Sequence, residues 1–212
     1  MKIVIIGATG FVGTKIVSEA IARGHRVIAV ARNPEKLESS PLLSTVNVDV
    51  YDTAALADVI KGSDAVISAF NPGWGNPDIY ALFIKGSKSI QQAVKLSGTK
   101  RLMIVGGAGS LVVGGMQIVD GPDFPAEIKP GATAARDYLE LIRSETELDW
   151  TVLSPPGNLA PGLRSGIFRT GDDSPVYDKD GKNGISVEDL AVALLSEVEN
   201  GKFIRKRFTV GY

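Results

Sequence analysis

Residues 3–13 read IVIIGATGFVG: four branched apolar residues lead into a loop with glycines at 7, 10 and 13. The apolar run predicts a buried strand, and a helical pattern of apolar residues follows the loop. Between them, Gly7 permits a tight turn, Gly10 lets the main chain approach a ligand, and Gly13 lets the helix pack closely on the sheet. A strand, a glycine loop and a helix in this order predict a site for the pyrophosphate of a dinucleotide.

Strand and helix signals alternate along the rest of the chain. We expect strands at Lys2–Ile6, Arg26–Ala31, Val46–Val50, Ala65–Ala69, Leu102–Val105, Thr151–Leu153 and Phe203–Val210. We expect helices at Phe11–Arg23, Ala54–Lys61, Ile79–Leu96, Ala132–Arg143 and Val187–Glu199, and a short helix after Pro34. Such alternation indicates βαβ units, which form a parallel sheet covered on both faces. The predicted fold is a doubly wound α/β Rossmann fold in a single domain, residues 1–212.

Two stretches rich in glycine and proline interrupt the alternation, residues 71–78 and 155–186. Long irregular loops in a compact domain are often functional. In a doubly wound sheet they would lie above the C-terminal strand ends, where ligands bind. We therefore expect both loops on the substrate side of the molecule.

The composition excludes several classes of function. The 212 residues carry a net charge of −1, with no cysteine and one histidine, His25, which we expect to be structural or exposed. Thiolate chemistry is excluded, and no metal site is expected. The balanced charge argues against nucleic-acid binding, and the basic cluster KFIRKRF at 202–208 alternates like an exposed edge strand. No apolar run reaches the about 18 to 20 residues of a membrane span, so we expect no membrane segment, no signal peptide, and a cytoplasmic location.

Motifs along nearly the whole chain carry a family resemblance. They are GATGFVG at 7–13, VAR at 30–32, VDVYD at 48–52, AVISAF at 65–70, LMIVGGAGSL at 102–111 and LDWTVLSPPGNL at 148–159. With them the chain resembles the atypical branch of the short-chain dehydrogenase/reductase superfamily. It is most similar to the NmrA-like and NADH-flavin reductase-like proteins, which include biliverdin reductase B-type flavin reductases.

The end of the second predicted strand bears on the choice of cofactor. An acidic residue there would hold the ribose 2′-hydroxyl of NAD, but the chain has Arg32, whose guanidinium suits the 2′-phosphate of NADP. NADPH is therefore expected over NADH, although Arg32 could also be a solvated surface residue or stack on adenine. The resemblance implies that Asp49 accepts a hydrogen bond from the adenine amino group; Asp49 could instead cap a helix or turn. The expected cofactor-binding residues are Gly7, Ala8, Thr9, Gly10, Phe11, Val12, Arg32, Asp49, Val50, Ser68, Ala69, Phe70, Gly106, Gly107, Pro155 and Gly157.

The sequence lacks the usual proton donor of short-chain dehydrogenases. In their Tyr-x-x-x-Lys pair, lysine lowers the pKa of a tyrosine that acts as general acid. None of the five tyrosines here is followed by lysine four residues later. Tyr138, in the predicted helix where such a tyrosine would be sought, is expected to pack in the interior. This argues against a standard alcohol dehydrogenase and a sugar epimerase.

Flavins and quinones accept hydride directly and can take their proton from water. We therefore expect an NADPH-dependent reductase of a flavin, with FMN or FAD as substrate, of a quinone, or of a similar conjugated acceptor. The resemblance implies that Ser110 lies near the nicotinamide as the catalytic residue; it could instead simply turn its loop. Gly157 stands where biliverdin reductase B-type proteins carry a histidine, which argues against biliverdin as the acceptor.

On the substrate side we expect Trp74 and Asn158, although Trp74 could equally seal its loop against the body. Arg164 and Arg169 could meet an anionic substrate. DKDGKNGISVED at 178–189 imitates a calcium loop, but Lys182 falls at a ligand position and Asn183 stands where the sharp-turn glycine belongs. There we prefer a turn into a helix capped by Ser186 and Asp189. The expected partner is a small molecule, and the expected state a monomer or small homo-oligomer. Two alternatives stay open: an NmrA-like redox sensor that binds NAD(P) without turnover, and a different reaction on an unrecognised metabolite.

Overall fold

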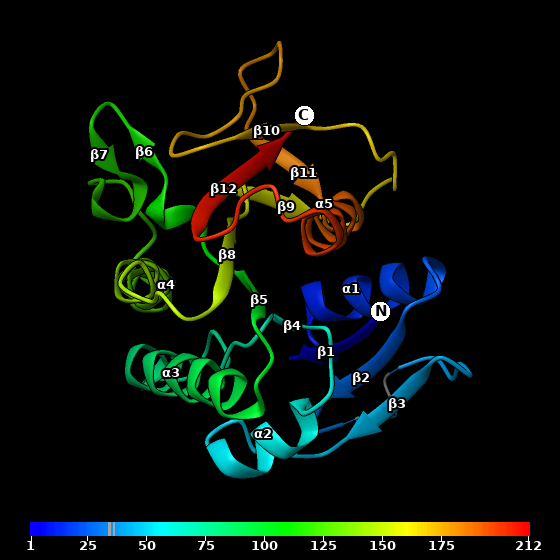
Figure 1. The fold of residues 1–212 in the computed structure, drawn as a ribbon. Helices are drawn as coiled ribbons and strands as arrows, with labels where there is room; N and C mark the ends of the chain where they lie inside the picture. The colour runs from blue at the N-terminus through cyan, green and yellow to red at the C-terminus, as the bar shows by residue number, and fades with distance from the viewer. Residues whose placement is uncertain (34, 36) are drawn as a thin grey trace.

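The computed structural model describes residues 1–33, 35 and 37–212, and within them one large sheet carries the fold (Figure 1). Its strands are β1 Lys2–Ile6, β2 Arg26–Val30, β3 Leu43–Val46, β4 Ala65–Ser68, β5 Arg101–Val105, β8 Asp149–Ser154, β10 Arg169–Gly171 and β12 Lys206–Gly211. The order across the sheet is β10-β12-β8-β5-β4-β1-β2-β3. Every neighbouring pair is parallel except β10 with β12. The predicted doubly wound α/β fold is confirmed.

Helices cover both faces of this sheet (Figure 1). They are α1 Phe11–Ala22, α2 Thr53–Ile60, α3 Ile79–Ser97, α4 Lys129–Ile142 and α5 Val187–Asn200. Helices α1 and α5 lie on one face, and α2, α3 and α4 on the other. Ile3 and Ile5 belong to the core under α1 and α5, whereas Val4 and Ile6 belong to the opposite core. Because alternate residues of a strand point to opposite faces, a strand buried on both sides reads as an unbroken apolar run.

The smaller elements lie beyond the C-terminal ends of the central strands. They are the short helices η2 Ala108–Ser110 and η3 Ile118–Asp120, the hairpin β6 Val112–Val113 with β7 Met116–Gln117, and the parallel pair β9 Asn158–Ala160 with β11 Gly184–Ser186. Both β9 and β11 come from the long segment 155–186, so part of that predicted loop is a two-stranded sheet.

The third strand lies earlier than we predicted. The expectation was Val46–Val50, but β3 spans Leu43–Val46 and pairs with β2, Val30 opposite Val46. β3 is an edge strand whose central residues, Ser44 and Thr45, are exposed, so it carries no apolar run. Apolar and polar residues alternate at 46–50 for another reason: Val48 and Val50 belong to an irregular segment and pack against the core. The short helix expected after Pro34 lies outside the described residues.

The basic cluster at 202–208 is not an exposed edge strand, so this prediction was wrong. Residues 202–205 form a turn, and β12 begins at Lys206. β12 runs parallel to β8 over Lys206–Thr209, and antiparallel β10 pairs with it only at Thr209–Gly211. Arg207, which lies before the residues paired with β10, is nevertheless only 6% exposed. The pairing with β10 joins segments far apart in the chain, and no local pattern reveals it.

A buried ion pair joins the sheet to α5 at the N-terminal end of the strands. Arg101 Nη2 lies 2.8 Å from Glu197 Oε1, and Arg101 Nη1 donates to Thr151 Oγ1 at 2.7 Å. Burial lowers the pKa of Arg101, and the neighbouring Glu197 carboxylate opposes that shift. His25, 8% exposed, lies 2.8 Å from Glu199 Oε1 at the same end of α5, which confirms its structural role.

We predict that Glu197→Ala lowers the free energy of unfolding by about 3–5 kcal/mol, because it leaves the Arg101 guanidinium buried without its counterion. Urea unfolding followed by circular dichroism measures the change. The matched control is Glu140→Ala, which removes an exposed pair with Arg143 and should cost at most about 1 kcal/mol. Equal losses in the two variants would contradict the prediction.

Candidate functional site

Two of the three glycines in the first loop are required by packing alone. Gly7 has φ of +77°, and a Cβ there would lie 2.5 Å from Ala69 O. A Cβ on Gly13 would lie 2.0 Å from Gly7 O. The main chains of the β1 turn, the β4 end and α1 thus meet without room for side chains.

Gly10 is different, because the protein itself leaves space beside it. A Cβ there would meet only Gly7 O, at 3.3 Å, and its φ of −78° suits any residue. Gly10 is also exposed. Packing of the fold therefore does not require glycine at this position, and the space beside it is where the sequence predicts the approach of a ligand.

Helix α1 begins with unsatisfied donors at this loop. The Thr14 N–H donates to Gly10 O at 3.0 Å, so the N–H groups of Phe11, Val12 and Gly13 precede the intrahelical bonds. No side chain caps the helix at Gly10. Free N–H groups and the positive end of the helix dipole favour an anion.

The sheet places this loop at the point where its strand order reverses. β1 lies between β2 and β4, and the chain leaves β1 toward one side and β4 toward the other. Ligands of doubly wound folds bind in the crevice outside the strand ends at such a point. Gly7 after β1 and Ala69 after β4, both expected to bind the cofactor, meet there.

The ends of β2 and of the segment after β3 approach each other. Arg32 and Asp49 are both exposed, and their charges act in opposite directions on Tyr51. Burial is the main cause that raises the pKa of Tyr51; Asp49 adds to it, and Arg32 opposes it. Asp49 Oδ1 accepts from the Tyr51 N–H at 3.0 Å, the turn geometry that we held open as its other role. Val50 is half-buried, and its carbonyl accepts from Ser89 Oγ at 2.6 Å.

After β4, the Phe70 ring is directed at α3. It stacks on Phe83 with ring centroids 6.1 Å apart and meets the Tyr51 ring edge-on at 6.2 Å. A Cβ on Gly86 would lie 2.4 Å from Phe70 Cε1, so Gly86 makes the space for this ring. Ser68, directly before this turn, is 7% exposed. The structure thus sets the Phe70 ring into an aromatic cluster beside the crevice.

The loop after β5 is held from inside by Ser110. Ser110 is 2% exposed, its Oγ donates to Gly107 O at 3.0 Å, and it lies 3.1 Å from Ser154 Oγ. Gly106 packs against β8, where a Cβ would lie 2.8 Å from Val152 Cγ1. In this arrangement the Ser110 hydroxyl closes the turn at 107–110.

The segment after β8 is positioned by a residue that the sequence analysis did not assign to the site. Asn183 Oδ1 accepts from the Gly157 N–H at 2.8 Å, and Asn183 Nδ2 donates to Val176 O at 2.7 Å. Pro155 is half-buried, and Asn158 is exposed at the start of β9. No local signal distinguishes Asn183, because its partners are 7 and 26 residues away.

Trp74 seals its loop against the body, which is one of the two roles that we held open. A Cβ on Gly131, in the first turn of α4, would lie 2.7 Å from Trp74 Cζ3, so the ring packs on α4. The residue nevertheless remains 55% exposed. Phe11, at the start of α1, is also exposed, at 52%.

Arg164 and Arg169, proposed for an anionic substrate, are engaged within the protein. Arg164 holds both carboxylate oxygens of Glu19, at 2.6 and 2.8 Å, and this hydrogen bonding lowers the pKa of Glu19. Arg169 donates to main-chain oxygens of Tyr177 and Tyr212.

Neither Tyr138 nor Tyr80 has the lowered pKa of a general acid. Tyr138 is 3% exposed, it donates to Ser87 O at 3.2 Å, and burial raises its pKa far above the ordinary value. Its predicted packing role is confirmed. The hydrogen bond from Tyr80 to Asp137, 2.8 Å long, raises the pKa of Tyr80 as well. A general acid needs a pKa lowered toward neutrality, which is the opposite shift.

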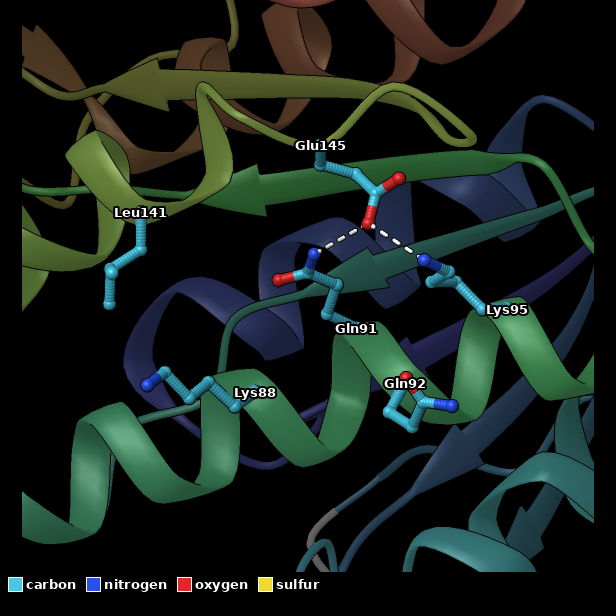
Figure 2. Close-up of a pocket in the computed structure, with 6 residues that line it drawn as sticks. All are labelled: Lys88, Gln91, Gln92, Lys95, Leu141 and Glu145. Atoms are coloured by element: carbon cyan, nitrogen blue, oxygen red, sulfur yellow. Dashed lines mark hydrogen bonds and ion pairs between the residues drawn. The ribbon is translucent and has the colours of Figure 1, made fainter.

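A hollow of about 270 Å³ lies elsewhere, between the C-terminal halves of α3 and α4 (Figure 2). Glu145 Oε2 accepts there from Gln91 Nε2 at 2.8 Å and from Lys95 Nζ at 3.3 Å. Helices that follow parallel strands run back along the sheet, so helix C-termini lie at the strand N-terminal end. The hollow is thus remote from the crevice at Gly10, and we do not assign the site to it.

Residues 178–189 hold their own main chain rather than a metal. Asp178 Oδ1 accepts from the N–H groups of Asp180 and Lys182, at 2.9 and 2.8 Å. Ser186 Oγ caps α5 by accepting from the Asp189 N–H at 3.0 Å, as predicted. The Asp189 half of the expected capping box was wrong, because the Ser186 N–H donates to the Tyr212 hydroxyl at 3.2 Å. Among the described residues no group of three or more His, Asp or Glu side chains could hold a metal ion. Among all the residues that the structure describes, no helix is long and apolar enough to cross a membrane.

The fold and the glycine crevice define a nucleotide-binding Rossmann protein. Comparison with known families makes this specific: residues 7–200 match the family described as NAD(P)H-binding, and the chain belongs to it. The resemblance inferred from the motifs is thereby confirmed at the family level.

Three solved structures resemble the chain over its whole length. One from Bacteroides thetaiotaomicron, provisionally named an epimerase, is 42% identical, with TM-score 0.93 and 96% of that chain covered. One from Burkholderia pseudomallei, provisionally named an exported protein, is 38% identical, with TM-score 0.88 and 100% covered. One from Streptococcus pneumoniae, provisionally named an NADH-flavin reductase, is 35% identical, with TM-score 0.88 and 99% covered.

We predict that Gly10→Ala weakens NADPH binding by at least about tenfold, because the added methyl group occupies the space kept for the pyrophosphate. The free energy of unfolding should change by no more than about 1 kcal/mol, because that methyl group meets only one protein atom. Nucleotide fluorescence titration and urea unfolding measure the two quantities. Gly75→Ala, in open space on the loop 71–78, is the control and should change neither. Unaltered binding in Gly10→Ala would refute the placement of the pyrophosphate.

Proposed function

We propose that the protein is an NADPH-dependent reductase of a flavin, a quinone or a similar conjugated acceptor. The observation that carries this proposal is the space beside Gly10, where a Cβ would meet only Gly7 O, in a chain that has no Tyr-x-x-x-Lys pair. When bound, the reduced nicotinamide supplies a hydride. An acceptor that can be protonated by water needs from the protein only binding and alignment. The similarity to a protein provisionally named an NADH-flavin reductase supports this assignment.

Each part of the crevice has a proposed task. The main chain of 7–12 holds the pyrophosphate, Arg32 holds the 2′-phosphate, and Asp49 with Val50 flanks the adenine. The residues after β4, β5 and β8 border the ribose and the nicotinamide; they are Ser68, Ala69, Phe70, Gly106, Gly107, Pro155 and Gly157. Trp74 and Asn158 face the acceptor.

We assign Ser110 a role that acts through Gly107. Its hydroxyl donates to the Gly107 carbonyl, so it sets the course of the main chain that borders the nicotinamide. This refines the role expected from the family, in which the serine itself lies near the nicotinamide.

The second candidate is a redox sensor that binds NAD(P) without turnover. The observation that favours it is the burial of Ser110, whose hydroxyl is committed to contacts within the protein. For either function we expect a cytoplasmic protein, as a monomer or small homo-oligomer.

Turnover distinguishes the two candidates. Purified protein is titrated with NADPH and then mixed with FMN, FAD or menadione while nicotinamide absorbance is followed. Steady oxidation that requires both protein and acceptor supports the reductase. Binding of NADPH without oxidation by any of these acceptors supports the sensor and refutes the reductase.

We predict that Arg32→Glu weakens NADPH binding on the order of a hundredfold and changes NADH binding by less than about threefold, because only NADPH carries the 2′-phosphate. The dissociation constants of both nucleotides are measured at one ionic strength. Arg26→Glu, an exposed arginine at the other end of β2, makes the same change in net charge and should have little effect on either. A similar loss of both nucleotides in Arg32→Glu would defeat the assignment.

A further inference from the structure

Arg207 is a buried cation on β12, beside the loop that follows β5. Its side chain is 3% exposed. In the sheet register Arg207 lies opposite Val152 of β8, which lies opposite Ile104 near the C-terminal end of β5. One charged side chain of the 202–208 cluster therefore lies in the interior, near the C-terminal edge of the sheet.

Within the described part of the chain, the guanidinium of Arg207 has one acidic partner, and it is solvated. Nε and Nη2 both donate to Asp173 Oδ1, at 3.0 and 2.5 Å, and the Asp173 side chain is 66% exposed. Nη1 is buried and has no partner among the described residues. Water screens the Asp173 charge far more than that of Arg207, so a net positive potential remains in the interior.

Two contacts connect this cation to the proposed acceptor side. Arg207 Nη2 lies 3.5 Å from Ser110 O, a long contact, and Ser110 Oγ holds Gly107 and Ser154. Asp173 O also accepts from the Val112 N–H at 2.8 Å, which ties the same turn to β6. Arg207 thus lies directly behind the 106–112 loop, which we propose borders the nicotinamide.

Hydride transfer creates a need for such a charge. A neutral flavin or quinone gains one hydrogen nucleus and two electrons as the C4–H bond of the reduced nicotinamide breaks and a new bond to the acceptor forms. The acceptor thereby becomes an anion, the nicotinamide ring a cation, and a proton from water later neutralises the acceptor. A preorganised positive charge in a dry site stabilises charge that develops in this way.

We propose that Arg207 stabilises the anionic reduced acceptor electrostatically and thereby selects acceptors that are neutral before reduction. The proposal rests on the reductase function given above. Arg207 acts through space and through the Ser110 peptide, as a positioning residue rather than by contact with substrate. The unpartnered Nη1 and the solvated counterion are what a purely structural clamp would lack.

Paired substitutions with opposite electrostatic effects test the proposal. Arg207→Met removes the cation, whereas Asp173→Asn removes its counterion and leaves the cation stronger. A structural clamp is broken by either change, so both would lower activity alike. An electrostatic role predicts opposite directions. Arg207→Lys retains the charge and should keep most of the acceptor preference that Arg207→Met loses. Arg205→Met, which changes an exposed arginine two residues away, is the control for net charge.

The first readout is the ratio of kcat for menadione to kcat for methylene blue. Menadione is neutral and becomes an anion, whereas methylene blue is a cation and becomes neutral. We expect this ratio to fall roughly tenfold in Arg207→Met, to rise in Asp173→Asn, and to stay unchanged in Arg205→Met. A general loss of structure lowers both rates and leaves the ratio as it was.

The second readout does not depend on turnover. The two-electron midpoint potential of riboflavin is measured with excess protein, because a site that favours the reduced anion raises it. A tenfold loss of that preference in Arg207→Met corresponds to about 30 mV for a two-electron couple. Asp173→Asn should shift the potential in the other direction.

The failures of the two proposals are distinguishable. Wild-type protein that turns over both acceptors, with the same ratio and the same riboflavin potential in all variants, would overturn the role of Arg207 alone. If the kcat ratio or the riboflavin potential changed in the same direction in Arg207→Met and Asp173→Asn, the role of Arg207 would also be overturned. Wild-type protein that neither oxidises NADPH with either acceptor nor shifts the riboflavin potential would overturn the reductase function itself.

Discussion

The close approach of three main-chain segments around Gly7 is the constraint on which the rest of the structure depends. The turn after β1, the end of β4 and the start of α1 meet there without side chains between them, since a Cβ on Gly7 or Gly13 would overlap main-chain atoms. This contact brings the start of α1 to the strand ends. It also leaves Gly10 exposed beside free N–H groups. One local packing requirement therefore both joins the elements of the fold and leaves the N-terminus of α1 open at the site that we propose for the pyrophosphate.

The second half of the chain is held to this frame by buried acidic groups. Glu19 of α1 receives Arg164. Asp189 of α5, which is fully buried, accepts from Ser165 Oγ at 2.6 Å and from the Tyr212 hydroxyl at 2.8 Å. The irregular segment after β9 is thereby fixed to α1, to α5 and to the last residue of the chain. Such a segment carries little hydrophobic area of its own, so charged hydrogen bonds determine its course.

Several site residues could be anticipated from the sequence because their signals are local. The glycine loop, Arg32 and the small residues after β4 follow strands whose apolar runs mark where each strand ends. Asn183 and Arg207 could not be found in this way. Asn183 acts on Gly157 from 26 residues away, and Arg207 is buried beside Asp173 and Ser110, which lie 34 and 97 residues away in the chain. The misplaced third strand has a related cause, since an exposed edge strand carries no apolar run.

The sequence by itself determined the alternation of strands and helices, the nucleotide crevice and the absence of a Tyr-x-x-x-Lys pair, because each depends on residues close together in the chain. The tertiary structure decided what surrounds the crevice. It turned the Ser110 hydroxyl inward, packed Trp74 on α4 and enclosed the Arg207 charge. These outcomes depend on pairings between residues tens of positions apart, whose geometry exists only after the sheet has assembled. The burial of a side chain is a property of its neighbours, and those neighbours are chosen by the fold.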